Sequence, residues 1–301
     1  MRVVNALSPI RLPEGIHLNV PEAAYHADPA PTPSASAGVL KTLATRSPLH
    51  AWHKHPRLNP EYSGGGRSDA MDAGTILHAL ICGTPLPYDV EAFPDYRTNA
   101  AKEWRDGVIS SGRIPILAHK IEPIYDVARG VRANIERMPE IAAAIESADK
   151  EATLIWRERG VLCRCRYDIL PPASFGFTID LKFTGLSAEP EQWGRTLIGS
   201  HLFQAALYPR AVQALRGDKP EFRFLVCETE PPYGVSIHAM DPELCDLAAR
   251  KLNHALDRWR SCTEADDWPG YESRTHYQAA PAWALAQQEE AEFRASVGDE
   301  P

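Results

Sequence analysis

The spacing of apolar residues changes character near residue 150. Up to that point apolar positions recur every three or four residues, as in 69-DAMDAGTILHALICG-83, which is the spacing of a helix that buries one face. Ser36 and Ser47 stand where N-caps are expected, and Pro48 suits the first position of the second helix. The predicted helices of this half cover residues 37–45, 48–55, 69–83, 98–110, 118–137 and 139–148.

From Glu151 onward the period shortens to that of β-strands. The runs ATLIW, VLCRCRYDIL and FGFTIDLKF alternate or stay apolar over strand lengths, with Gly160 and Pro171-Pro172 as turns between them. They are followed by a helix over 189–214, strands near 221–229 and 233–240, and a long helix over 242–262. This order predicts an α/β fold of mixed α+β type, with a central mixed sheet flanked by helices and preceded by a helical lobe.

Three segments of the chain differ in composition. Residues 1–33 are rich in proline and aperiodic, which predicts an N-terminal arm or a loosely packed lead-in. Residues 34–262 are expected to form one domain, with a helical part at 34–150 and a sheet core at 151–262. Residues 263–301 form an acidic C-terminal tail, for which a flexible, solvated chain is the expectation.

Charge is spread unevenly along the chain. The formal net charge is −8, and residues 261–301 hold nine Asp/Glu against two Arg, so the tail accounts for −7 of it. Residues 40–67 hold five Lys/Arg and three His against Glu61 alone. A nearly neutral body with local basic clusters is compatible with a nucleic-acid partner, although such clusters are often plain solvated surface.

Several classes of protein find no support in the sequence. No apolar run reaches the ~18 residues of a membrane helix, and the first residues lack the apolar stretch of a secretory signal, so we expect a cytoplasmic protein without a membrane partner. The six cysteines include no CxxC pair, which favours free thiols and argues against an iron–sulfur cluster. Without a GxxxxGK[ST] loop or a GxSxG elbow, neither a nucleotide cofactor nor α/β-hydrolase chemistry is expected.

Two of the strand-like runs carry an aspartate near the end. Alternation along FGFTIDLKF places Asp180 and Lys182 on one face of their strand. If this strand pairs with VLCRCRYDIL, Asp168 comes close to Asp180, and two such carboxylates repel unless a counter-charge is present. Mg²⁺ or Mn²⁺ would supply that charge, because these cations take carboxylate and carbonyl oxygens as ligands. The alternative is an ordinary ion pair between Asp180 and Lys182 at a sheet edge.

Three flanking motifs give the two aspartates a context. These are the GxxxH helix 74-GTILH-78, the QxxxY helix 204-QAALY-208 and the arginine-containing strand CRCRYD. Together with Asp168 and, twelve residues on, Asp180-Leu181-Lys182, they resemble the PD-(D/E)XK nuclease motif in the RecB-like branch that includes RecE-type exonuclease VIII. The resemblance spans residues 34–262 and implies a restriction-endonuclease-like core. Tyr167 stands where the motif has proline, which is not a metal ligand.

The resemblance implies a role for each matching residue. His78, Asp168, Asp180 and the carbonyl of Leu181 would bind Mg²⁺ or Mn²⁺, and Lys182 would be the catalytic lysine. A lysine at such a site can orient the attacking water and offset charge that develops on a phosphate. Outside this context, a lone histidine among apolar neighbours on a helix would be taken as a core residue.

Other residues are expected to support the site. Gln204 and Tyr208 share a helix face and would brace the site or contact the DNA backbone, or else pack the helix against the sheet. Glu151 is expected as an accessory ligand, as a partner of a ligand, or as an exposed strand-end residue. Arg164 and Arg166 share one strand face within ~13 Å of the metal site, where we expect them to contact DNA phosphates.

The leading hypothesis is a Mg²⁺-dependent exodeoxyribonuclease that degrades linear duplex DNA from 5′ ends and leaves 3′ single strands for recombination or phage-type repair. The alternatives are a single-strand or flap-specific nuclease on the same centre, and a catalytically idle DNA-binding scaffold. The resemblance also implies a single-strand annealing protein as partner and a ring-shaped homo-oligomer, neither of which the residues themselves indicate.

Overall fold

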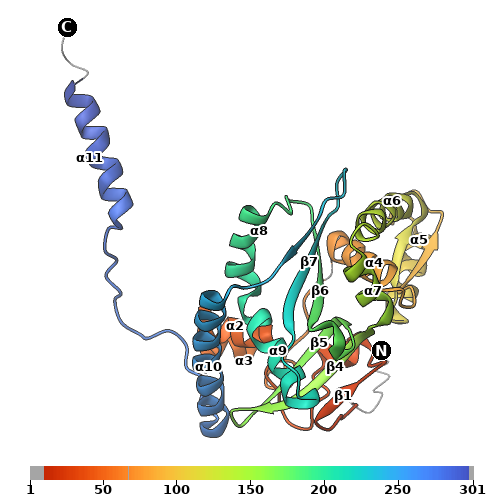
Figure 1. The fold of residues 1–301 in the computed structure, drawn as a ribbon, viewed down its shortest axis with the longest axis horizontal. Coiled ribbons are helices and arrows are strands. Elements are labelled where there is room, and N and C mark those ends of the chain that lie inside the picture. The colour runs from red at the N-terminus through yellow and green to blue at the C-terminus, as the bar shows by residue number, and fades with distance from the viewer. Residues whose placement is uncertain (1–9, 67, 298–301) are drawn as a thin grey trace. The chain divides into compact units, whose positions relative to one another are not determined.

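The computed structural model describes residues 10–66 and 68–297. The chain divides into two compact units, Met1–Pro269 and Gly270–Pro301. In the first unit, the described residues form a six-stranded sheet in the order β1-β4-β5-β6-β7-β8, with helices on both faces (Figure 1). The predicted mixed α/β architecture is therefore confirmed.

Three consecutive antiparallel strands form the centre of the sheet. They are β4 (Asp149–Glu158), β5 (Val161–Leu170) and β6 (Phe177–Thr184). On one side β1 (Gly15–His17) pairs antiparallel with β4, and on the other β7 (Glu221–Glu228) runs parallel to β6 and is followed by the antiparallel β8 (Val235–His238). The sheet is mixed, as predicted, and mostly antiparallel.

The crossover from β6 to β7 contains an irregular helix. It consists of α8 (Pro190–Thr196), a π-helical turn (Leu197–His201) and α9 (Leu202–Arg216). One continuous helix over 189–214 was predicted from the sequence. The π-turn ends three residues before Gln204, and turns of this kind are frequent at functional sites.

Each face of the sheet has its own helical layer and its own core. One layer holds α2 (Ala37–Thr45), α3 (Pro48–Lys54), α9 and α10 (Pro242–Ala265); the other holds α4 (Asp69–Cys82), α6 (Ala118–Ile135) and α7 (Pro139–Ser147) (Figure 1). Trp156, Tyr167 and Trp259 belong to the first core, whereas Ile169 and Phe177 belong to the second. Along VLCRCRYDIL, Cys163, Cys165 and Tyr167 belong to the first core. The charged residues Arg164, Arg166 and Asp168 alternate with them and so lie on the opposite face of the strand.

Side-chain caps begin several of the helices. The Ser36 hydroxyl accepts a hydrogen bond from the N–H of Val39 and the Ser47 hydroxyl accepts one from the N–H of His50, so both predicted N-caps are confirmed. Ser68 caps α4 in the same way. Each cap satisfies a backbone N–H that the helix leaves unpaired, and it stabilises the helix by about 1 kcal/mol.

A small parallel sheet in the N-terminal half was not predicted. β2 (Tyr88–Glu91) pairs with β3 (Ile114–Leu117), and α5 (Asn99–Ser110) lies between them in sequence. Each strand has only four residues, which is too short for its period to be distinguished from a loop.

The described part of the predicted N-terminal arm, residues 10–33, contains a strand, a helix and buried residues that the sequence analysis did not identify. β1 extends the main sheet, α1 (Glu22–His26) follows it, and Val20, Asp28 and Ala30 are buried. These elements are held by contacts with distant strands, so no local period marks them. Residues 1–9 lie outside the described residues.

The predicted acidic tail, residues 263–301, contains the end of one helix and a second helix of its own. In the first unit α10 continues to Ala265, beyond the predicted end at residue 262. The second unit contains α11 (Ala282–Val297), on which Trp283, Leu285 and Phe293 are exposed.

The remaining features of the fold are the cysteine side chains and the length and polarity of the helices. All six cysteines lie in the described residues as free thiols, and Cys245 is the exposed one. Among the described helices, none combines the length and the apolar character that crossing a membrane requires.

Candidate metal centre and active site

The register of β5 and β6 brings the two aspartates together. Ile169 pairs with Ile179, and Asp168 and Asp180 come next on the two antiparallel strands, where the ladder between them ends. The carboxylate of Asp168 accepts a hydrogen bond of 2.8 Å from the backbone N–H of Leu181. The closeness predicted from strand pairing is therefore present in the structure.

Asp180 is buried and held on two sides. One of its oxygens forms an ion pair with Lys182 Nζ, as the shared strand face predicts, and the other accepts a hydrogen bond from the side-chain amide of Gln204 on α9. Gln204 therefore braces the site. The Asp180–Lys182 contact alone is also compatible with an ordinary ion pair. The residues around it must therefore show whether it belongs to a metal site.

Those surroundings contain a second group of ligating side chains. His78 on α4, Glu151 on β4 and Asp168 on β5 each offer a ligand atom, and these atoms all lie within 4.8 Å of one another. His78 Nδ1 is 3.6 Å from Asp168 Oδ2, and its ring packs edge-on against Phe183 with centroids 5.5 Å apart. Three elements that are distant in sequence thus converge on one point.

Glu151 reaches this point through an unusual backbone conformation. Its φ is +53°, a left-handed value that is rare for a residue with a side chain, and it lies within β4 rather than at the strand end. The β4–β5 ladder contains pairs at Lys150 and Ala152 but not at Glu151, whose partner in register would be Asp168. A left-handed conformation of a non-glycine residue costs about 1–3 kcal/mol of folding free energy, so it persists only where surrounding contacts impose it.

Burial and charge set the protonation of the group. Burial raises the pKa of Asp168 to about 6, against the opposing attraction of Lys182, and it raises the pKa of Asp180 to about 6 in the same way. Burial and the charge of Lys182 lower the pKa of His78. At neutral pH the imidazole is neutral and the carboxyls ionise, which is the state in which each can bind a metal.

Lys182 stays charged in this setting. Burial opposes its charge, and the carboxylates of Asp180 and Asp168 outweigh burial, so the pKa of the lysine is raised. A cationic amine therefore lies beside the carboxylates at neutral pH. It neutralises only part of a group that holds three carboxylates.

The donor set fits a divalent cation. Two carboxylates and a neutral imidazole converge, and oxygen ligands with a histidine suit Mn²⁺ or Mg²⁺. Asp180 engages Lys182 and Gln204, so His78, Glu151 and Asp168 are the residues best placed to hold the ion. For Leu181 the structure shows the N–H bonded to Asp168, and the ligand role of its carbonyl stays a prediction.

Tyr208 and Arg164 are not members of this ligand group. The Tyr208 ring is buried against Tyr167 and Phe222, at centroid distances of 5.1 and 5.4 Å, so it packs the helix against the sheet, and the residue also lines the cleft that contains the group. The prediction that Arg164 contacts DNA phosphates is wrong, because the residue is only 4% exposed and its guanidinium is bonded to Ser34 beside Asp28. Strand alternation could not reveal that a distant segment covers this arginine.

Arg166 lies at the edge of the site. Its Nε forms an ion pair with Glu151, and its Nη1 donates to the backbone carbonyl of Val20 at 2.7 Å. The side chain is 15% exposed and lines a cleft of about 990 Å³ together with His78, Asp168 and Lys182. One wall of this cleft comes from the N-terminal arm, including Tyr25, which the sequence analysis did not connect with the site.

The fold and the convergent residues define a PD-(D/E)XK-like domain. The family described as "PDDEXK-like domain of unknown function (DUF3799)" matches residues 39–280, and the chain belongs to this family. The match includes every predicted site residue and begins after the N-terminal arm.

A solved structure from Eubacterium rectale named "Putative exonuclease" has a similar fold. The two chains are 14% identical, the alignment covers 89% of this chain and 98% of that chain, and the TM-score is 0.55. At this identity the likeness shows the fold alone. No curated protein sequence matches the chain.

Proposed function

We propose that the protein is a divalent-metal-dependent exodeoxyribonuclease that acts on linear duplex DNA from 5′ ends. The observation that carries the proposal is the convergence of His78, Glu151 and Asp168 beside the Asp180–Lys182 pair. An ordinary ion pair needs only its two members and gives no reason for a histidine and two further carboxylates from three other elements. The PDDEXK-like family and the resemblance to exonuclease VIII-like proteins support the same function.

The chain's own residues suit phosphodiester hydrolysis. A bound divalent cation would supply a Lewis acid that polarises the phosphate and acidifies a water. His78, Glu151 and Asp168 would hold it, while Lys182 offsets negative charge as the phosphodiester is attacked. Gln204 fixes the Asp180 carboxylate before substrate arrives, so little reorganisation is needed during the reaction.

A DNA degradation assay tests the proposal. Purified protein is incubated with linear duplex labelled at the 5′ or the 3′ end, with the same sequence as a covalently closed circle, and with single-stranded DNA, in Mg²⁺ or in EDTA. We expect Mg²⁺-dependent release of nucleotides from the 5′ label of linear duplex and resistance of the closed circle.

Each other outcome points elsewhere. Cleavage of the closed circle would indicate an endonuclease, and preference for single strands would indicate the single-strand alternative. DNA binding without cleavage in Mg²⁺ and in Mn²⁺ would contradict the proposal and favour a scaffold.

A further inference from the structure

Residues 18–28, here called the wall segment, form one side of the candidate active-site cleft although the family match begins at residue 39. β1 fixes the start of the segment, because Gly15 to His17 pair with β4 immediately before it. Val20, Glu22 and Tyr25 are among its residues that line the cleft. The segment is therefore part of the site by position.

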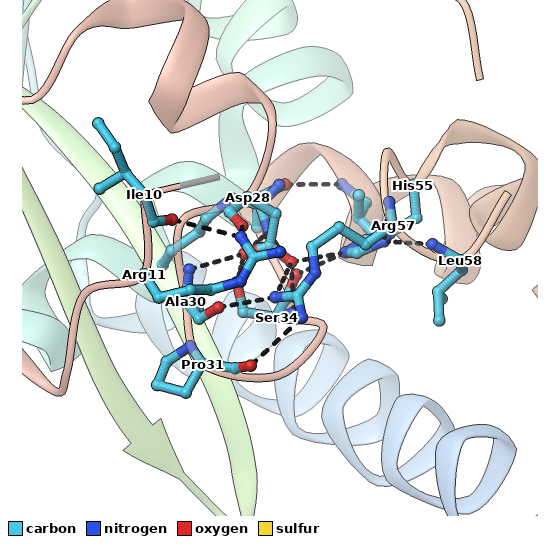
Figure 2. Close-up of polar contacts among 12 residues, drawn as sticks. Ile10, Arg11, Asp28, Ala30, Pro31, Ser34, His55, Arg57 and Leu58 are labelled. Atoms are coloured by element: carbon cyan, nitrogen blue, oxygen red, sulfur yellow. Dashed lines mark hydrogen bonds and ion pairs between the residues drawn. The ribbon is translucent and has the colours of Figure 1, made fainter. Parts of the chain in front are cut away.

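Asp28 fixes the other end of the wall segment in the protein interior. Its carboxylate accepts hydrogen bonds from the backbone N–H of Ser34 at 2.9 Å and from the Ser34 hydroxyl at 2.6 Å (Figure 2). It also lies 3.3 Å from Nη1 of Arg164 and 3.3 Å from Nε2 of His55. Two backbone N–H groups donate to His55 Nδ1, so the imidazole proton is on Nε2, which lies 3.0 Å from the Ser34 carbonyl oxygen and 3.3 Å from the Asp28 carboxylate.

Arg166 connects the wall segment to the candidate metal centre. Two features of the segment hold its guanidinium: the Val20 carbonyl, which accepts from Nη1 at 2.7 Å, and the Tyr25 ring, whose centroid is 5.8 Å from Cζ. The remaining contact runs from Nε to the Glu151 carboxylate. The arginine thus transmits the position of the wall segment to Glu151.

Glu151 needs such a partner. Its left-handed backbone takes it out of the β4–β5 ladder, so the sheet alone does not fix its side chain. The ion pair with Arg166 uses one carboxylate oxygen and leaves the other for a cation. Partners of this kind orient metal ligands, and their loss typically weakens metal affinity by about 10- to 100-fold.

We propose that the wall segment is a working part of the metal centre, and that Arg166 is the positioning residue through which it sets the Glu151 carboxylate. Arg166 acts on the carboxylate and contacts neither the cation nor the scissile phosphate. The inference rests on the proposed function, because it takes His78, Glu151 and Asp168 as the cation ligands.

A double-mutant cycle on Mn²⁺ affinity tests the inference. Calorimetric titration with Mn²⁺, in the absence of DNA, is carried out on the full chain, on Arg166→Gln, on Glu151→Gln and on the double variant. We expect Arg166→Gln to weaken Mn²⁺ binding about 10-fold or more, and the double variant to bind no more weakly than Glu151→Gln alone. A residue that acts through Glu151 has nothing left to position once that carboxylate is gone.

Arg157→Gln is the matched control. Arg157 also joins the sheet to the N-terminal arm, through an ion pair with Glu14 at 3.3 Å, and it does not line the cleft. We expect unchanged Mn²⁺ affinity in this variant. Tyr25→Leu removes the ring beside Arg166 and leaves the ion pair intact, so a weakening of several-fold is expected there, with folding of each variant checked by thermal unfolding.

The outcomes separate the two levels of the proposal. If the wild-type protein binds no Mn²⁺, both the proposed function and this inference are contradicted. If the wild-type protein binds Mn²⁺, and Glu151→Gln weakens this binding but Arg166→Gln does not, only the inference about Arg166 is contradicted. Additive losses in the double variant would also overturn it, as would an effect of Arg166→Gln confined to the salt dependence of duplex binding in EDTA, which would mark a phosphate contact.

Discussion

Two clusters of charged side chains, both of which include a residue of β5, have opposite electrostatic character. Around Asp28, one carboxylate is surrounded by donors, and although burial opposes it, the His55 hydrogen bond and the charge of Arg164 lower the pKa of Asp28. Around Asp168, carboxylates outnumber their counter-charges, and burial raises the pKa of Asp168 and of Asp180 to about 6.

The difference separates a structural cluster from a candidate functional one. The Asp28 carboxylate needs no further counter-charge, because it accepts hydrogen bonds from Ser34 and lies within 3.3 Å of the Arg164 guanidinium. The Asp168 cluster holds more negative charge than Lys182 and Arg166 balance, in a place where charge is costly. A divalent cation would supply what this cluster lacks, which is the physical basis for reading it as a metal centre.

The largest effect on stability is expected at the Asp28 cluster. Asp28→Ala leaves Arg164, only 4% exposed, without its charge partner, and breaking a buried pair of this kind costs about 3–5 kcal/mol of unfolding free energy. Urea denaturation measures the loss. Asp257→Ala, which removes an exposed partner of Arg159, is the control and should change little. Equal effects of the two substitutions would show that the Asp28 cluster is not the anchor described here.

The largest effect on activity is expected at the other cluster. Lys182→Ala and Asp180→Asn should each lower the nuclease rate about 100- to 1,000-fold, because each removes a charge preorganised at the site. Rates are measured on linear duplex in Mg²⁺, and circular dichroism checks that both variants stay folded. A rate near that of wild type in either variant would remove that residue from the catalytic set.

A smaller effect concerns stability and pH. The pKa of Asp168 is raised in the folded state, so the metal-free protein loses stability as pH rises from about 4 through about 6. Asp168→Asn removes this loss and can still accept the Leu181 N–H. In EDTA, the variant should therefore gain about 1–3 kcal/mol relative to wild type between pH 4.5 and 7.5.

Comparing the two proteins by urea denaturation at both pH values cancels most other titrating groups. A difference in unfolding free energy that stays constant with pH would mean that Asp168 is not under the electrostatic stress inferred here.

Local pattern was sufficient for some parts of the site. The two-residue period placed Asp180 beside Lys182, and the pairing of neighbouring strands placed Asp168 next to Asp180. The GxxxH helix brought His78 forward as a candidate, and the structure places it 3.6 Å from Asp168. Asp180 and Lys182 depend on short-range geometry that the sequence encodes directly, whereas His78 was a candidate only through the family resemblance.

Other parts depend on contacts between distant segments. Nothing near Glu151 signals a left-handed residue inside a strand, so it was expected at the strand end. Arg164 and Arg166 looked equivalent by alternation, and what separates them is the arm: Ser34 and Asp28 bury the first, whereas the second reaches the cleft. The arm itself has no period, because Tyr25 and Asp28 also contact Arg166 and Arg164, which are more than a hundred positions away.

The most direct test of the central claim is a calorimetric titration with Mn²⁺ of wild type, His78→Ala and, as control, His119→Ala, which alters an exposed histidine on α6. The account predicts one Mn²⁺-binding event that His78→Ala weakens about 10-fold or more and His119→Ala leaves unchanged. Equal Mn²⁺ affinity in wild type and His78→Ala would contradict it and return His78 to the role of a core histidine beside an ordinary ion pair.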